Sequence, residues 1–255
     1  MSDDVVIYEE RDRIGIVRLN RPSKHNAFSA ALFDALRKVF DGLPEKVRAV
    51  VLTTTSEQFC AGLDLSEHQL SKPFESILFS RSGHKLFEQI QHCGRPIITA
   101  MPGAVIGGGL ELAAMTHVRI AEPSTFYQLP EGRRAIFLGG GGTVHLAKII
   151  GPDRVREMML TGRRLDAETG MQWGLSHYLV GKGEASSFAL EVAEKVAANA
   201  PISNYMMLHA IDYINEMPIQ AGLFTESLAQ AITLTSEDAI KGMEAFLRHK
   251  KDATF

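Results

Sequence analysis

Cysteine is scarce in this chain, which has only Cys60 and Cys93 among its 255 residues. Two cysteines are too few for a disulfide scaffold, and neither has neighbours at the spacing of a metal site. The first ten residues, MSDDVVIYEE, are acidic, whereas a secretory signal begins basic and then turns apolar. We therefore expect a reduced, cytoplasmic protein, and the cysteines indicate no metal.

An excess of positive charge is also missing, because 27 Lys and Arg face 30 Asp and Glu, for a net charge of -3. This balance gives no basic field for nucleic acid or an acidic membrane, so local cationic residues must meet any anionic ligand. The length and the 45% hydrophobic content suit one globular domain, with room for a small appendage.

Long hydrophobic runs are rare, and only residues 96–115 come near the length of a membrane helix. Glu111 is the one charged residue in this run, which Pro96, Pro102 and four glycines interrupt. Such breaks favour a buried strand, a loop and the start of a buried helix over a membrane span.

The predicted elements change character along the chain. Its first two-thirds alternates strands and helices, whereas the last third is mostly helical. This order predicts an α/β core followed by a helical part that packs against a partner subunit. We expect strands at 5–10, 14–20, 47–55 and 96–101, short extended segments at 118–123 and 125–131, and helices at 28–40, 73–93, 143–151, 152–162, 166–174, 184–200, 206–217 and 236–250.

Three glycines, 107–109, stand directly before the carboxylate of Glu111. Glycines at the start of a helix let a ligand approach the backbone and leave amide N–H groups unpaired. Such groups can stabilise an oxyanion that forms during a reaction. A tight packing turn between strand and helix explains the same glycines equally well.

Two further segments carry candidate groups. In EQFCAGLDLSEH, residues 57–68, the amide of Leu63 is a second possible oxyanion donor, although a plain loop with Asp64 as a helix cap fits too. In YQLPEGRRAIFLGGGGT, residues 127–143, partial burial of Glu131 would raise its pKa and make it a proton donor near neutrality. The alternative is a surface glutamate paired with Arg133 or Arg134. The glycine run lacks the Gly-Lys-Ser/Thr of a phosphate loop.

Five motifs in order, RPSKHNAFS, FCAGLDL, GAVIGGGLELA, LPEGRR and GGGGT, resemble the crotonase (enoyl-CoA hydratase/isomerase) superfamily from about residue 5 to 250. The resemblance implies an α/β fold, a spiral of ββα units with a C-terminal helical trimerisation region. Residues 1–195 would form the core with the acyl-CoA site, and 196–255 the oligomerisation region. Homotrimers, or hexamers made of two trimers, are implied as well.

The resemblance also implies the chemistry. A thioester enolate would be held by the backbone N–H groups of Leu63 and Gly108. Glu111 would deprotonate a water that attacks Cβ, and Glu131 would protonate Cα. The implied reaction is hydration of a 2-enoyl-CoA, with coenzyme A as part of the substrate and no separate cofactor.

For coenzyme A, the resemblance assigns phosphate contacts to Lys24, with Arg21 and His25 nearby. It assigns the rest of the coenzyme to Ala27 and to the backbone of Ala61, Asp64 and Leu65. Near the chain end, Phe246 and a basic cluster resemble a region that reaches a neighbour's cofactor, although a solvated helix end explains that cluster as well. The cluster consists of Arg248, His249, Lys250 and Lys251.

Departures from the family pattern bear on the substrate. Arg134 stands where an apolar residue is usual, and Phe137 and Leu138 replace part of a frequent Ile-Pro-Gly turn within the segment 137–142. A methylthioacryloyl or branched-chain enoyl-CoA therefore fits the sequence as well as a straight-chain substrate does. An arginine near Glu131 would lower the pKa of that carboxyl group. Thioester hydrolysis, double-bond isomerisation and a non-catalytic acyl-CoA or RNA-binding scaffold stay open as alternatives.

Overall fold

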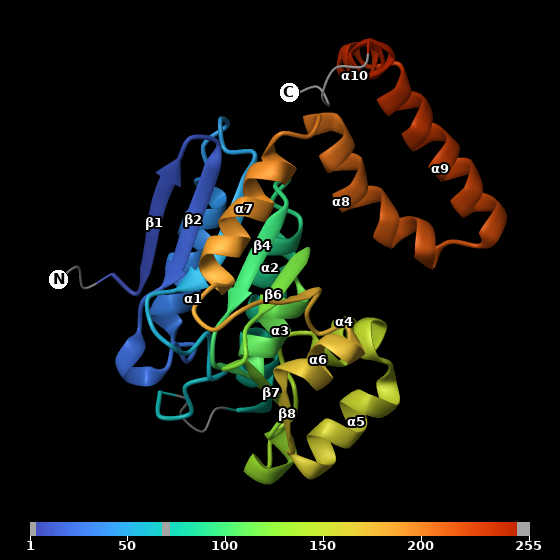
Figure 1. Cartoon of the computed structure of the whole chain (residues 1–255). Coiled ribbons are helices and arrows are strands. Elements are labelled where there is room, and N and C mark those ends of the chain that lie inside the picture. Colours follow the sequence, from blue (N-terminus) through green and yellow to red (C-terminus); the bar gives the residue numbers. More distant parts are fainter. Residues whose placement is uncertain (1–3, 68–71, 249–255) are drawn as a thin grey trace.

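The computed structural model describes residues 4–67 and 72–248, and its strands form two sheets (Figure 1). The larger sheet has the order β1-β2-β3-β4-β6-β9, and the smaller has the order β5-β7-β8. The strands are β1 (Val6–Arg11), β2 (Ile14–Leu19), β3 (Ala49–Thr54), β4 (Ile97–Met101), β5 (Ala104–Ile106), β6 (Val118–Ala121), β7 (Phe126–Gln128), β8 (Arg164–Asp166) and β9 (Tyr178–Leu179).

The earlier helices pack around the two sheets, whereas the last helices of the chain extend away from them (Figure 1). Helices α1 to α3 connect strands of the core, while α8 to α10 project away from it at the C-terminal end. The helices are α1 (Ala30–Asp41), α2 (Pro73–Gln91), α3 (Gly108–Ala114), α4 (Gly142–Ile150), α5 (Pro152–Thr161), α6 (Ala167–Trp173), α7 (Ala185–Ala197), α8 (Pro201–Glu216), α9 (Ile219–Leu234) and α10 (Glu237–Leu247), with 3-10 turns η1 (Pro22–Lys24) and η2 (Glu131–Arg134).

The larger sheet begins with the predicted hairpin and then becomes parallel. Strands β1 and β2 pair antiparallel, whereas β2, β3, β4, β6 and β9 pair parallel in succession. Strands of a parallel sheet are buried on both faces, which agrees with the burial of β4 along its whole length and of β3 in all but its last residue. On one face, helix α7 packs four alanines spaced four residues apart against this sheet: Ala185, Ala189, Ala193 and Ala197.

The hydrophobic run 96–115 contains β4, β5 and all of α3. The predicted strand and helix are present, whereas the predicted loop between them includes the short strand β5. Within the described residues, no helix combines the length and the apolarity needed to cross a membrane. The predicted α/β core and helical C-terminal third are therefore both present.

Several elements differ from the prediction. Helix α1 begins at Ala30 and not at residue 28, because Ser29 caps it and Phe28 pairs with Leu63 in an isolated bridge. Strands β8 and β9 and helix α9 had no predicted counterpart. Strands of two or three residues are too short to show a period, and α9 is apolar on most sides. The domain division after residue 195 stays a prediction.

Asn26 is fully buried and ties the loop before α1 to the segment that follows β3. Its Nδ2 lies 2.7 Å from the carbonyl oxygen of Gln58 and 3.1 Å from that of Phe59, and its Oδ1 accepts from the amide of Arg21 at 2.7 Å. Its φ of 55° is left-handed, a conformation that asparagine tolerates better than most side chains. Asn26 therefore fixes the backbone that leads to Leu63.

Asn26→Ala should lower the free energy of unfolding by about 2–4 kcal/mol, because it removes the hydrogen bonds to the carbonyl of Phe59 and to the amide of Arg21 and places alanine at a positive φ. Chemical denaturation followed by circular dichroism measures the change. Asn215→Ala, at an exposed site on α8, serves as the control and should change stability by about 0.5 kcal/mol or less. Equal losses for both variants would contradict the role given to Asn26.

Candidate active site

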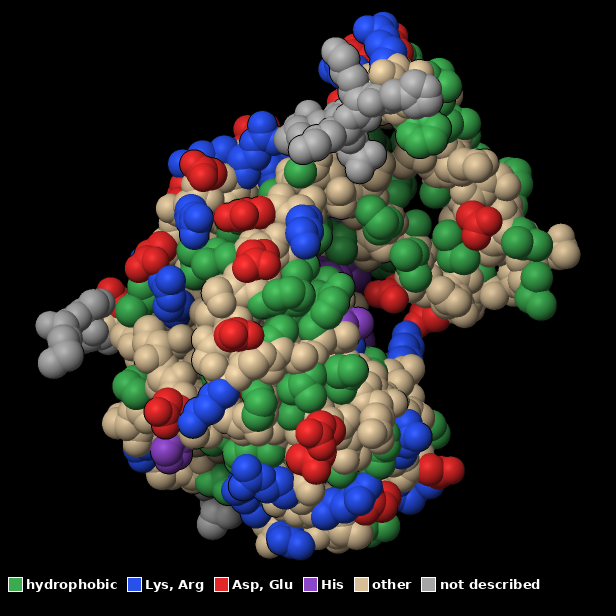
Figure 2. Space-filling model, in the orientation of Figure 1, with side chains coloured by type: hydrophobic (Ala, Val, Ile, Leu, Met, Phe, Trp, Pro, Cys, Tyr) green, Lys and Arg blue, Asp and Glu red, His purple; other side chains and the backbone are tan. Residues whose placement is uncertain are grey.

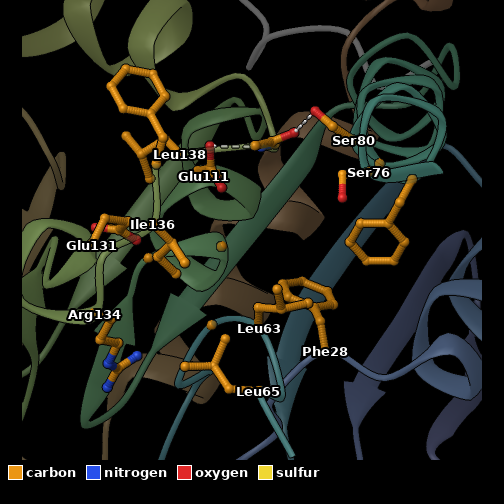
Figure 3. A pocket seen from close by; sticks show the side chains of 18 of the residues that line it. Phe28, Leu63, Leu65, Ser76, Ser80, Glu111, Glu131, Arg134, Ile136 and Leu138 are labelled. Carbon is orange, nitrogen blue, oxygen red and sulfur yellow. Dashed lines mark hydrogen bonds between the residues drawn. The ribbon is translucent and has the colours of Figure 1, made fainter. Parts of the chain in front are cut away.

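One cavity of about 320 Å³ brings together segments that lie far apart in the sequence (Figure 3). Its walls come from the loop after β3, the N-terminal end of α3, helix α2 and the segment from η2 to α4. The residues that line it are Phe28, Ala61, Gly62, Leu63, Leu65, Ser76, Phe79, Ser80, Gly83, Gly107, Gly108, Glu111, Glu131, Arg134, Ile136, Phe137, Leu138, Gly139 and Gly140.

The two predicted oxyanion donors lie on neighbouring segments of this cavity. The amide of Cys60 donates to Ala104 O at 2.9 Å, and the amide of Ile106 donates back to Cys60 O at 3.0 Å, so the two segments run side by side. Among the described residues, none accepts a hydrogen bond from the amide of Leu63 or of Gly108. Both amides therefore remain available to a ligand.

Gly62 shows how closely these segments approach each other. A Cβ added to Gly62 would lie 2.8 Å from Ile106 O and 3.3 Å from the amide nitrogen of Gly108, and Gly62 has a φ of 88°. A side chain at this position would push the two donor segments apart.

Glu111 is 5% exposed and holds its carboxylate against the glycine run before α4. Its Oε1 accepts hydrogen bonds from the amides of Gly140 at 2.9 Å and Gly142 at 2.8 Å. Figure 3 shows Glu111 in the wall of the cavity. Burial raises the pKa of Glu111, while the two amide hydrogen bonds favour the charged form and lower it. These bonds employ Oε1 only, and none of the described residues donates to Oε2.

The glycine run has a function that sequence reasoning missed. A Cβ on Gly142 would lie 2.9 Å from Cγ of Glu111, and one on Gly140 would lie 2.8 Å from its Oε2. Glycines at these positions therefore make room for the carboxylate as well as donating to it. The sequence contains both a glutamate in an apolar run and a distant glycine cluster. Their relation can be recognised only when the structure shows that the two are in contact.

Glu131 begins η2 and is 6% exposed, so it is not the surface glutamate of the alternative interpretation. A Cβ on Gly107 would lie 2.6 Å from its Oε1, and its buried Oε2 has no hydrogen-bond partner within the described chain. Burial is the largest cause that raises the pKa of Glu131 to about 7, and the negative charge of Glu111 adds to it. A carboxyl group with this pKa can donate a proton near neutral pH.

Glu131→Gln should change the pH dependence of stability. Between pH 4.5 and about 7, the folded protein keeps a proton on Glu131 that the unfolded chain has released, so wild-type stability falls as pH rises through this window. The neutral glutamine removes this decline. Between pH 4.5 and pH 8, the free energy of unfolding of the variant should therefore rise relative to that of wild type by roughly 1–3 kcal/mol. Urea titrations of both proteins at several pH values measure this change. If the difference between their free energies of unfolding stays the same at every pH, the raised pKa is refuted.

The residues predicted to contact coenzyme A lie mostly outside the cavity. Ala61 and Leu65 line it, but Lys24, His25, Ala27 and Asp64 do not. The amide of Ala61 donates to His25 O at 3.0 Å and that of Asp64 to Phe28 O at 2.9 Å, so neither amide is free for a ligand.

Arg21 is already committed to carboxylates within the chain. It contacts Asp64 at 2.6 Å and Glu67 at 2.5 Å. Hydrogen bonds from Ser66 and Arg21 hold the pKa of Asp64 below its usual range. Lys24 instead donates to the Ser66 hydroxyl at 3.2 Å, and its charge also helps to lower the pKa of Asp64. Arg248 contacts Glu244 at 3.0 Å, and residues 249–251 of the predicted basic cluster lie outside the described residues.

Helix α2 supplies the part of the wall that sequence analysis did not identify. Ser76, Phe79 and Ser80 line the cavity, and the Ser80 hydroxyl donates to Gly139 O at 2.7 Å (Figure 3). No group of three or more His, Cys, Asp or Glu side chains, among those the structure describes, is arranged to hold a metal ion.

Comparisons with known proteins agree with this geometry. Residues 9–255 match the protein family described as enoyl-CoA hydratase/isomerase. The chain is 30% identical over 249 residues to "Short-chain-enoyl-CoA hydratase" of Clostridium acetobutylicum, covering 96% of this chain and 95% of that one. It is 32% identical over 248 residues to "Enoyl-CoA hydratase domain-containing protein 2, mitochondrial" of Mus musculus, covering 94% and 83%.

Solved structures give the same result. A Rhodopseudomonas palustris structure superposes with a TM-score of 0.94 at 42% identity, covering 96% of this chain and 95% of that one. The structure of an enoyl-CoA hydratase from Bacillus anthracis superposes with a TM-score of 0.91 at 29% identity, covering 98% of each chain. The predicted crotonase fold, with two sheets and C-terminal helices, is thereby confirmed. The chain belongs to the enoyl-CoA hydratase/isomerase family.

Proposed function

We propose that this protein is an enoyl-CoA hydratase that adds water reversibly across the 2,3 double bond of an enoyl-CoA thioester. The observation that carries the proposal is the meeting of two free amides, Leu63 and Gly108, with two buried carboxyl groups, Glu111 and Glu131, in one cavity. Hydration requires these four groups together, because the reaction must stabilise an oxyanion, take a proton from the attacking water and supply a proton to carbon.

In the proposed mechanism, Glu111 takes a proton from a water molecule whose oxygen attacks Cβ. The electrons of the double bond move onto the thioester oxygen, which the N–H groups of Leu63 and Gly108 stabilise as an enolate. Glu131 then donates its proton to Cα, and the carbonyl forms again. The raised pKa of Glu131 suits the donor, and the two amide bonds to Glu111 favour its charged form as the base.

We further propose that the coenzyme leaves the cavity past Ala61 and Leu65 and that Lys24 meets its phosphates. The hydrogen-bond partner of Lys24 supports this assignment, because it is a hydroxyl group and not a carboxylate, so the ammonium forms no close ion pair within the described chain. The compartment stays a prediction, cytoplasmic from the sequence alone.

The acyl group is open to a small or unusual chain, such as a methylthioacryloyl or branched one. A cavity of about 320 Å³ is at the small end for a ligand site, which supports a short acyl group. Phe137 and Leu138, which depart from the family pattern, both line it.

Glu111→Gln and Glu131→Gln should each lower kcat for crotonyl-CoA hydration at least about 100-fold with a smaller effect on KM, because each removes a proton-transfer group. Loss of the enoyl thioester absorbance measures the rate. Glu168→Gln, at an exposed site on α6, should leave the rate unchanged.

The same assay separates the alternative reactions. Release of free thiol would indicate a thioester hydrolase, and formation of the enoyl absorbance from a 3-enoyl-CoA would indicate an isomerase. Binding of an acyl-CoA without any reaction would indicate a non-catalytic scaffold. Wild-type hydration rates in either Gln variant would refute the mechanism.

We also propose that three copies of the chain assemble through the C-terminal helices, with six as the larger alternative. Figure 2 shows hydrophobic side chains spread along this projecting part of the molecule. An exposed apolar surface of this kind marks an interaction site. Its largest exposed members include Tyr213 on α8, Ile219, Leu223, Phe224 and Leu228 on α9, and Phe246 and Leu247 on α10.

Sedimentation velocity should give wild-type protein the mass of three or six chains. Phe224→Glu places a charge on a side chain that is 67% exposed in the single chain, and it should shift the distribution towards monomer. Gln172→Glu adds the same charge to α6 of the core and should leave the mass unchanged. A wild-type monomer would rule out the proposed assembly.

A further inference from the structure

Ser80 of α2 and Glu111 of α3 form hydrogen bonds to opposite ends of one peptide group. The carbonyl oxygen of Gly139 accepts from the Ser80 hydroxyl at 2.7 Å (Figure 3). The amide of Gly140, which belongs to the same planar group, donates to Glu111 Oε1 at 2.9 Å. Because a peptide group is rigid, the orientation of its carbonyl determines the direction of its N–H.

Few contacts fix the orientation of this peptide. It lies between two glycines, whose backbone rotates more freely than that of other residues. Within the described residues, no group other than the Ser80 hydroxyl donates to Gly139 O. If the peptide turned over, the amide of Gly140 would leave Glu111, and the carbonyl oxygen would take its place. A partly negative oxygen would then face a carboxylate that is 5% exposed, which is unfavourable.

Helix α2 gives the Ser80 hydroxyl a fixed position. Phe87, two helical turns later, is 2% exposed and stacks against the ring of Phe33. It also touches the glycine run, since a Cβ on Gly140 would lie 2.7 Å from Cε2 of Phe87. A water molecule could also donate to the Gly139 carbonyl, but water would follow the peptide as it turns. A hydroxyl group on an anchored helix stays in place and so holds the peptide.

We propose that Ser80 is a positioning residue, because its hydroxyl fixes the 139–140 peptide with the N–H directed at the Glu111 carboxylate. Ser80 thus acts through the peptide and not on the reacting atoms. The inference rests on the proposed function only where it makes Glu111 the base, because both hydrogen bonds belong to the structure itself.

The consequence is a change in the proton affinity of Glu111. The amide of Gly140 lowers the pKa of this carboxyl group, against the effect of burial. Without it, the amide of Gly142 would be the one remaining donor among the described residues. Loss of the Ser80 hydroxyl lets the peptide turn away for part of the time, and so it raises the pKa of Glu111.

Other titratable groups near this contact come from η2, α2 and α4. The charge of Glu131, on η2, interacts with that of Glu111. On α2 and α4, His84 and His145 lie beside Gly141, where a Cβ would be 4.0 Å and 3.1 Å from their Cδ2 atoms. A change of pH can act through any of these groups, so the test must assign its effect to Glu111.

The first test is the pH profile of kcat/KM for crotonyl-CoA hydration by wild type, Ser80→Ala and Ser80→Thr. Glu111 must be charged to act as the base, so a raised pKa moves the acid limb of the profile to higher pH. Ser80→Ala should move this limb by about half a unit to one unit and change KM less than about twofold. The alkaline limb, which reports Glu131, should stay in place. Ser80→Thr retains the hydroxyl and should keep the wild-type profile.

Ser82→Ala is the matched control, because Ser82 lies on the same helix but its hydroxyl accepts from Arg37 of α1 at 3.2 Å. This variant should keep the wild-type profile. Thermal unfolding of each variant shows that the rates are measured on folded protein.

The second test needs no activity. Urea titrations measure the free energy of unfolding of wild type and Ser80→Ala at several pH values. A raised pKa in the folded state costs stability as pH rises through it, so the loss caused by Ser80→Ala should be larger at about pH 8 than at about pH 4.5. In a Glu111→Gln background the loss should be the same at every pH, which assigns the effect to Glu111 and not to a histidine.

Three results would overturn the inference: an acid limb that does not move in Ser80→Ala, an equal shift in Ser82→Ala or Ser80→Thr, or a loss of stability that is the same at every pH. A protein that hydrates crotonyl-CoA but gives any of these results keeps the proposed function and loses the inference. A protein without hydratase activity, in which the loss of stability grows with pH only while Glu111 is present, loses the proposed function and keeps the inference.

Discussion

The site depends on one buried contact, the carboxylate of Glu111 held by the amides of Gly140 and Gly142. A carboxylate that is 5% exposed cannot stay charged without donors, and here the backbone supplies them. The contact joins the first turn of α3 to the start of α4, so it sets the position of the catalytic candidate and of the cavity wall together. It also explains the glycines, since a Cβ at either position would collide with the carboxylate.

Glu131 experiences the opposite environment. It has a buried oxygen without a partner, whereas Glu111 receives two amide hydrogen bonds. Burial raises the pKa of both; the amides of Gly140 and Gly142 oppose this effect at Glu111, whereas a backbone hydrogen bond and the charge of Arg134 oppose it at Glu131. Two carboxyl groups in one cavity are thereby given different tendencies to hold a proton, which is the asymmetry that acid–base chemistry needs.

The sequence was sufficient for the family and for four residues that the structure brings into one cavity, Leu63, Gly108, Glu111 and Glu131, because glycines, a glutamate and their order are local signals. It did not indicate the part of the wall that α2 supplies. It could not reveal contacts between distant segments. Nothing near Arg21 shows that Asp64 and Glu67 occupy it, and nothing near Gly142 shows that it touches Glu111. Strand β9 is too short to have a period, and the apolar residues of α9 are spread around most of the helix, so they show no helical stripe.

The donors at positions 63 and 108 belong to the main chain, while the walls around them are side chains. The backbone fold fixes the positions of the two amides, whereas single substitutions can change the side chains of the walls. Under the proposed function, a lineage could therefore exchange Leu63, Ile136 or Phe137 and accept new acyl groups while it keeps the two main-chain donors. Under the proposed function, substitutions in the walls can thus change the preferred substrate without removing the groups that the reaction needs.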